Sequence, residues 1–246
     1  MSGASSTARP EILVAEGRAD QAALGAELCG RAIQEAVDRR GVARVALSGG
    51  STPTDTYQAL AALSLPWSQV EWFWVDERAV GPDHPRSNFG AAAKDLGLHT
   101  GARGRFHRMP GEAEDLDGAA RGYEALLRRS FGVASAVSFD AMTLGVGDDG
   151  HTASLFPGLG VVGVDDRLVI SIPEQPDKKL EPRISLTAPV ICEAKLVVVL
   201  ARGAGKKPVI ERALAPGSED AFPSRLLQRA RGRVVWLVDR DAAPSP

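Results

Sequence analysis

The stretch ARVALSGGSTPTD, residues 43–55, decides the fold class. It opens with an apolar run of strand length, turns at two glycines, and reaches Thr52 and Pro53, which suit the first positions of a helix. Residues 70–75 form another apolar run, which leads through a polar stretch into a second helical pattern. Strands that alternate with helices in this way indicate a mostly parallel sheet with helices on both faces.

Apolar spacing extends this pattern over the chain. The remaining predicted strands are 105–109, 139–146, 168–172, 183–186, 196–200 and 234–238. The predicted helices are 20–40, 52 to about 63, 87 or 88 to about 96, 111–131, 204–214 and 222–230. Segments around 81–86 and 173–182 are predicted to be functional loops. The sequence therefore predicts an α/β fold, a single-domain three-layer sandwich with a mostly parallel Rossmann-like sheet over residues 11–241, after a flexible tail at 1–10.

Composition excludes several classes of protein. The chain has 246 residues, of which 44% are hydrophobic and 24% charged, as in globular proteins. Its 29 Lys and Arg and 31 Asp and Glu give a net charge of −2, which offers no footprint for nucleic acid. The longest apolar stretch, 196–201, is far below the ~18 residues of a membrane span, and the first ten residues do not resemble a secretory signal. We therefore predict a cytoplasmic protein with neither a nucleic-acid nor a membrane partner.

Unusual polar sequences follow four of the predicted strands. They are SGGST at 48–52, DER at 76–78, GDDGH at 147–151 and GAGK at 203–206. Ligands of open parallel sheets lie beyond the carboxyl ends of the strands. These four segments are therefore expected to form one site.

The SGGST turn is suited to an anion. Gly49 and Gly50 allow a tight bend, and Ser51, Thr52 and the N–H groups of the next helix can hold a phosphate. The turn is neither a GxGxxG fingerprint nor a Walker loop. The alternative is an ordinary strand-to-helix turn. Lys206 could pair with the phosphate, or it could be an exposed lysine at a helix start.

The GDDGH and DER segments carry candidate catalytic groups. A neutral imidazole at His151 is suited to take a proton from water, and Asp149 could orient that ring. The alternative is a turn whose acidic residues cap the following segment. Arg78 could offer a planar fork to a carbonyl or sugar oxygen, held by Asp76 and Glu77, or it could form a surface ion pair. The four histidines show no metal-ligand spacing, so no metal site is expected.

Together these segments resemble a known family. The matching segments are LSGGSTP at 47–53, VDER at 75–78, SN at 87–88, LGVGDDGHTASLFPG at 144–158, RISLT at 183–187 and GAGK at 203–206. Their order resembles that of the 6-phosphogluconolactonase family, which belongs to a larger group that includes glucosamine-6-phosphate deaminase. The resemblance covers essentially the whole chain, and DGHTASLFP is its most specific part.

The resemblance implies hydrolysis of 6-phospho-D-glucono-1,5-lactone, a phosphosugar lactone, to 6-phosphogluconate in the oxidative pentose phosphate pathway. It implies no metal or organic cofactor and a monomer. Carried over by motif, His151 is the general base, Asp149 supports it, and Arg78 holds the lactone or its oxyanion. The residues implied to bind substrate or phosphate are Gly49, Gly50, Ser51, Thr52, Asp76, Asn88, Arg183 and Lys206.

Two other functions remain open at this point. A deaminase of amino-sugar phosphates would release ammonia, but Phe156 stands where deaminases carry a carboxylate, and Arg78 where they carry an aromatic residue. A sugar-phosphate sensor would bind without turnover. Such a regulator should carry a helix-turn-helix, for which the short N-terminal tail offers no room.

Overall fold

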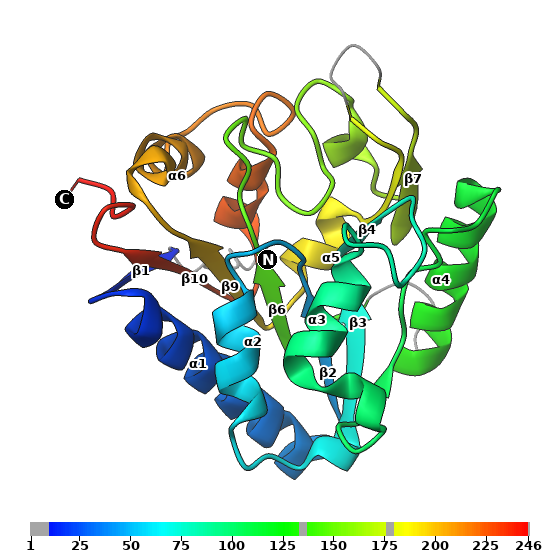
Figure 1. Cartoon of the computed structure of the whole chain (residues 1–246). Coiled ribbons are helices and arrows are strands. Elements are labelled where there is room, and N and C mark those ends of the chain that lie inside the picture. The colour runs from blue at the N-terminus through cyan, green and yellow to red at the C-terminus, as the bar shows by residue number, and fades with distance from the viewer. Residues whose placement is uncertain (1–9, 133–136, 176–179, 246) are drawn as a thin grey trace, which may run out of the picture.

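A seven-stranded sheet, parallel throughout, runs through the middle of the molecule (Figure 1). The computed structural model describes residues 10–132, 137–175 and 180–245. The strands of this sheet are β1 (Glu11–Ala15), β2 (Ala43–Leu47), β3 (Val70–Trp74), β5 (Arg105–Phe106), β6 (Ala141–Leu144), β9 (Leu196–Ala201) and β10 (Arg233–Asp239). Their order in space is β1-β10-β9-β6-β2-β3-β5, so that the first and last strands of the chain are neighbours.

Helices cover both faces of this sheet, which confirms the predicted three layers (Figure 1). The α-helices are α1 (Arg18–Arg40), α2 (Thr54–Ala61), α3 (Asn88–Leu96), α4 (Leu116–Phe131), α5 (Ala188–Cys192) and α6 (Lys207–Leu214). Helices α1, α2 and α3 share one hydrophobic cluster with the sheet. Helices α4, α5 and α6 share a second cluster with its opposite face.

The sequence of β3, VEWFW, shows why the central strands are largely apolar on both of their faces. Trp72 and Trp74 pack toward α1, α2 and α3, whereas Phe73 between them packs into the opposite cluster. Successive side chains of a strand point to opposite faces of the sheet, so a strand covered on both faces needs apolar residues at odd and at even positions. The largely apolar runs therefore predicted the central strands correctly.

A second, smaller sheet was not predicted. Strands β4 (Asp76–Arg78), β8 (Arg183–Leu186) and β7 (Val169–Ile172) form an antiparallel sheet in the order β4-β8-β7. Ile184 and Leu186 of β8 belong to the same hydrophobic cluster as α4 and the central sheet. The two sheets therefore share one core and form one domain.

Several predicted helix boundaries were wrong. Helix α2 begins at Thr54 with Pro53 at its N-cap and no side-chain cap, so Thr52 does not cap it. Helix α4 begins at Leu116 because Asp115 caps it, accepting from the Gly118 N–H at 2.8 Å. The 3₁₀-helices are η1 (Trp67–Gln69), η2 (Leu98–Thr100), η3 (Val161–Gly163), η5 (Ala204–Lys206) and η6 (Pro223–Arg229), the last two within segments predicted to be α-helical.

Other predictions were shortened, missed or lie outside the structure. Strand β5 covers only the first two residues of the predicted strand 105–109, and β1 and α5 were missed. Most of the predicted N-terminal tail, residues 1–9, lies outside the described residues, as do residues 176–179 of the predicted loop 173–182. Among the helices of the described ranges, none has the length and apolar content needed to cross a bilayer.

The strand order fixes the place of a ligand site. From β2 the chain proceeds outward to β3 and β5, and then returns to β6 on the other side of β2. At such a switch point the connections after the two central strands lead away from each other and leave a crevice at the carboxyl ends. The turns that follow β2 and β6 are SGGST and GVGDDGH. The two most unusual polar segments therefore lie side by side.

Candidate active site

A pocket opens at this crevice and encloses about 480 Å³ of empty space, mouth included. The turns after β2 and β6, the small sheet and the start of α3 supply its lining, which consists of Ser48, Gly49, Asp76, Arg78, Asn88, Gly145, Val146, Gly147, His151, Ala153 and Arg183. Three of the four predicted polar segments contribute to the lining, and the fourth, GAGK, lies beside the pocket without lining it.

His151 and Asp149 form a hydrogen-bonded pair on the turn after β6. Nδ1 of His151 lies 2.6 Å from Oδ1 of Asp149, which also accepts the His151 backbone N–H at 3.1 Å. Burial acts to raise the pKa of Asp149, but these hydrogen bonds outweigh it and hold the pKa below its ordinary value. An ionised Asp149 accepts the Nδ1–H, which leaves Nε2 as the basic nitrogen of the ring.

Two further residues fix the imidazole by packing. The ring of Phe156 lies against it with centroids 4.5 Å apart. A Cβ atom at Gly147 would lie 2.1 Å from Cε1 and Nδ1 of the ring, so only glycine fits there. Sequence reasoning missed this role of Gly147; its signal was a glycine at the strand end, directly before the acidic pair.

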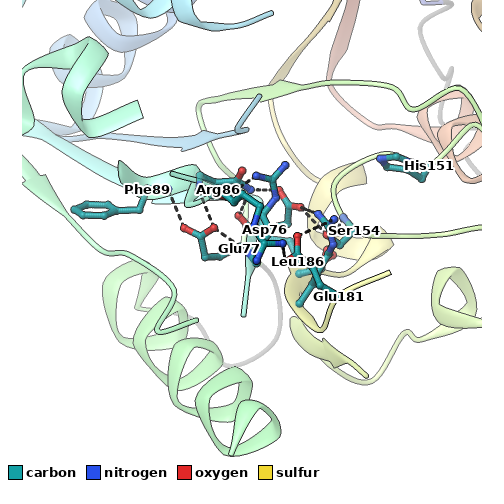
Figure 2. Close-up of polar contacts among 12 residues, drawn as sticks. Asp76, Glu77, Arg86, Phe89, His151, Ser154, Glu181 and Leu186 are labelled. Carbon is teal, nitrogen blue, oxygen red and sulfur yellow. Dashed lines mark hydrogen bonds and ion pairs between the residues drawn. The ribbon is translucent and has the colours of Figure 1, made fainter. Parts of the chain in front are cut away.

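The carboxylate of Asp76 lies on the opposite wall. The residue is 6% exposed, and its Oδ1 accepts from Nδ2 of Asn88 at 3.0 Å while its Oδ2 accepts from Oγ of Ser154 at 2.6 Å. Figure 2 shows this contact as part of a polar network around Asp76 and Glu77, from which His151 stands apart. Asp76 thus connects β4 with α3 and with the loop that carries His151.

Glu77 is the buried centre of that network, and sequence reasoning gave it only a supporting part (Figure 2). Its Oε1 accepts from the backbone N–H groups of Arg78 and Asn88, and its Oε2 accepts from the Phe89 N–H and the Ser87 Oγ, all within 2.9 Å. Burial raises the pKa of Glu77 above its ordinary value, although the hydrogen bonds oppose this. The carboxylate fastens β4 to the start of α3 and so sets Arg78 and Asn88 in the pocket wall.

Two guanidinium groups line the same wall. Arg78 pairs with Arg183 in the register of β4 and β8, and one nitrogen of Arg78 donates to the Arg86 carbonyl at 2.6 Å. Arg183 has its guanidinium carbon 5.4 Å from the centroid of the Phe156 ring and one nitrogen 3.9 Å from Asp76. In the part of the chain that the structure describes, Nε of Arg78 and Nε of Arg183 are buried without a hydrogen-bond partner. The wall can therefore donate to an oxygen or an anion.

Of the predicted phosphate-binding turn, residues 49–52, only the first residue lines the pocket. Gly49 lines it and packs so closely on Asn88 that a Cβ would lie 1.7 Å from its Oδ1. Gly50, Ser51 and Thr52 follow outside the lining. Nζ of Lys206 donates to the Val146 carbonyl at 2.9 Å and to Asp148 at 2.5 Å, which keeps it beside the pocket and outside the lining.

Among the described residues, no three His, Cys, Asp or Glu side chains lie together in a group that could hold a metal ion. The chemistry that this site can perform with its own residues consists of proton transfer by an imidazole, stabilisation of negative charge by two guanidinium groups, and binding through amides and carboxylates.

Comparisons with known proteins find similar sequences over most of the chain. Residues 16–236 match the model of the glucosamine-6-phosphate isomerases/6-phosphogluconolactonase family. A 6-phosphogluconolactonase of Synechocystis sp. is 39% identical over 214 residues, which cover 85% of this chain and 87% of the relative.

Solved structures are also similar. The 6-phosphogluconolactonase of Trypanosoma brucei superposes with a TM-score of 0.84 at 30% identity, covering 96% of this chain and 98% of that one. A glucosamine-6-phosphate deaminase superposes with a TM-score of 0.74 at 22% identity, covering 94% of this chain and 98% of that one. The second likeness concerns the fold alone.

Proposed function

The chain belongs to the glucosamine-6-phosphate isomerase/6-phosphogluconolactonase family, and on this premise we propose that it hydrolyses 6-phospho-D-glucono-1,5-lactone to 6-phospho-D-gluconate. This reaction is the hydrolytic step of the oxidative pentose phosphate pathway. The enzyme is thus a carboxylic ester hydrolase. Its partner is a small phosphosugar lactone, and we propose that it acts as a cytoplasmic monomer without a nucleic-acid or membrane partner and without a cofactor.

The reaction needs one proton transfer and one site for negative charge. Nε2 of His151 takes a proton from water as the water oxygen attacks the lactone carbonyl carbon, which gives a tetrahedral oxyanion. Arg78 stabilises this oxyanion, and Asp149 stabilises the imidazolium through Nδ1–H. The bond between the carbonyl carbon and the ring oxygen then breaks, and the imidazolium returns its proton to the leaving ring oxygen. Water is consumed and an open-chain acid is released.

Phosphate recognition is proposed at the far end of the substrate. The turn at Gly49, Gly50, Ser51 and Thr52 offers backbone N–H groups and hydroxyls near the start of α2. Lys206 and Arg183 supply positive charge beside it. Lys206 bonds to the Val146 carbonyl and to Asp148, so a phosphate would compete with a carboxylate for the same ammonium group. We assign Asp76 and Asn88 to the sugar, because both line the pocket.

The single observation that carries this proposal is the contact of His151 with Phe156 at 4.5 Å, beside its hydrogen bond to Asp149. A deaminase of this group carries a carboxylate at the position of Phe156. An apolar ring there leaves the imidazole with one acidic partner. That arrangement suits activation of water and lacks an acid–base group that deamination would use.

The test is a coupled assay with freshly made 6-phosphogluconolactone as the substrate. Formation of 6-phosphogluconate, followed through its NADP-dependent dehydrogenase, should exceed spontaneous hydrolysis in proportion to enzyme concentration. A rate equal to the background would contradict the proposal. Binding of the phosphosugar without turnover would indicate a sensor, and ammonia released from glucosamine 6-phosphate would indicate a deaminase.

A further inference from the structure

The segment that follows His151 contains an unusual backbone conformation. Ala153 has a φ of +47°, and within the described ranges it is the one residue other than glycine with a positive φ. This left-handed region crowds the Cβ of any L-residue against its own backbone. Ala153 also lines the pocket, two residues from His151. Strained backbone persists where surrounding contacts hold it, and such positions often serve function.

The contacts that hold this turn come from the residues on both sides of Ala153. Thr152 is 1% exposed, and its Oγ1 donates to the Gly145 carbonyl at 2.9 Å. Ser154 is 0% exposed, and its Oγ donates to Asp76 at 2.6 Å. Its backbone N–H donates to Oγ of Ser185 in β8 at 3.2 Å. Figure 2 shows the Ser154 side chain joined to the Asp76 network.

The anchors of these two hydroxyls belong to different elements. Gly145 directly follows β6, whereas Asp76 begins β4 of the small sheet. The turn is thus fixed to the central sheet on one side and to the small sheet on the other. Two backbone bonds add to this, from the Gly147 N–H to the His151 carbonyl at 2.9 Å and from the Leu155 N–H to the Thr152 carbonyl at 3.0 Å.

We propose that Thr152 and Ser154 are positioning residues, whose buried hydroxyls hold Ala153 in its left-handed conformation and thereby hold His151 at the pocket. Without these bonds an alanine would relax to an ordinary φ, because its own preference opposes the native conformation. Relaxation two residues from the imidazole would move it relative to the lactone carbonyl. This inference rests on the proposed hydrolysis, since it concerns the orientation of the proposed general base, His151, toward the lactone carbonyl.

The experiment compares kcat and KM for 6-phosphogluconolactone in Thr152→Val and Ser154→Ala, each of which removes one hydroxyl. We expect kcat to fall about tenfold or more in each, with KM changed less than about threefold, because a misaimed base affects turnover more than binding. Thr152→Ser keeps the hydroxyl and should restore kcat to within about twofold of wild type. The matched control is Thr187→Val, which removes an equally buried hydroxyl bonded to the Arg167 carbonyl at 2.8 Å, outside the pocket lining.

A second change separates positioning from stability. Glycine adopts positive φ readily, so adding Ala153→Gly to Thr152→Val should recover kcat at least about threefold over Thr152→Val alone. A hydroxyl that only stabilised the fold would show no such recovery. If Thr152→Val does not fold, the same comparison is made with Ser154→Ala. Its kcat should rise when Ala153→Gly is added, and should not rise if the hydroxyl only stabilises the fold.

Two outcomes overturn the inference: kcat of the hydroxyl-deleted variants within about twofold of Thr187→Val, or a loss of kcat that Ala153→Gly leaves unchanged. A wild-type protein without lactonase activity would instead contradict the proposed function, so the two failures are distinguishable.

Discussion

Strand β6 has an aspartate at each end, and the two carboxylates lie in opposite surroundings. Asp140, just before the strand, has a side chain 3% exposed that accepts from Arg40 at 2.5 Å, from Lys195 at 2.8 Å and from the Arg44 N–H at 2.9 Å. Asp149, beyond the other end, has a side chain 51% exposed that accepts from the ring and the amide of His151.

Burial acts to raise the pKa of both groups, and hydrogen bonds lower it further than burial raises it. The difference lies in their partners. Arg40 of α1 and Lys195, directly before β9, both donate to Asp140, which therefore fastens α1 and β9 to the start of β6. The partner of Asp149 is the imidazole of the proposed general base. One carboxylate therefore holds the sheet together, and the other can respond to a reaction.

Removal of the imidazole is the largest test of this contrast. His151→Ala should lower kcat by about 10²–10⁴-fold, because the positioned base is lost. Its thermal midpoint should stay close to that of wild type, since the side chain is partly exposed. Steady-state kinetics and thermal unfolding measure both, with His99→Ala as a histidine control outside the pocket. Near-normal turnover by folded His151→Ala would remove His151 from its proposed role.

Asp149→Asn should lower kcat by about 10²-fold, because an amide no longer fixes the ring with Nδ1–H toward it and stabilises the imidazolium less. Its free energy of unfolding should change by less than about 1 kcal/mol, since the carboxylate is half exposed. Chemical denaturation and kinetics on the same preparation provide the comparison. A large loss of stability with full activity would reverse the roles assigned to the two aspartates.

Asp140→Asn should show the opposite result. Leaving Arg40 and Lys195 without their carboxylate should lower the free energy of unfolding by about 3 kcal/mol and leave kcat unchanged. Because the folded pKa of Asp140 lies below its unfolded value, its stabilisation is complete above about pH 4 and is lost as the pH falls toward the folded pKa. The variant should therefore lose less stability than wild type below about pH 4. Equal acid sensitivity of the two proteins would contradict this account.

The smallest effect concerns a lysine beside each end of β6. Lys206→Ala should lower kcat/KM for the phosphorylated lactone about tenfold more than for unphosphorylated gluconolactone, because remote binding of phosphate contributes to catalysis. Lys195→Ala, which loses its bond to Asp140, should leave both values unchanged and lower the thermal midpoint. Equal losses of Lys206→Ala on both substrates would remove the proposed phosphate contact.

The central strands were predictable because a sheet covered on both faces leaves largely apolar runs in the sequence. Strand β4 was not, because Asp76, Glu77 and Arg78 are polar and become a strand only by pairing with β8, far along the chain. Strand β1 was missed although it is largely apolar; it is an edge strand with Ile12 36% and Val14 44% exposed. Both cases depend on tertiary neighbours, which local patterns do not contain.

Some features of the candidate site could likewise be predicted from the sequence, and others depend on the folded structure. Asp149 and His151 are two residues apart, so their pairing could be expected from the sequence itself. The role of Glu77 in fixing β4 to α3 and the role of Gly147 in leaving room for the imidazole depend on distances between atoms that only the folded chain defines. The left-handed turn at Ala153 is the clearest case, since alanine gives no local signal for a positive φ.

The pairing of β1 with β10 has a consequence for how the protein is made. A ribosome adding 5–20 residues per second delivers β10 roughly 10–40 s after β1. During that interval β1 has no neighbour in the sheet, because among the described strands it pairs with β10 alone. Strand β1 contains the charged residue Glu11, and its Ile12 and Val14 stay partly exposed even in the folded protein. The unpaired segment therefore has only a moderate tendency to associate with other apolar surfaces. The segment from β2 to β9, which carries all the residues that line the pocket, can meanwhile assemble, and the last strand then closes the sheet by entering between β9 and β1.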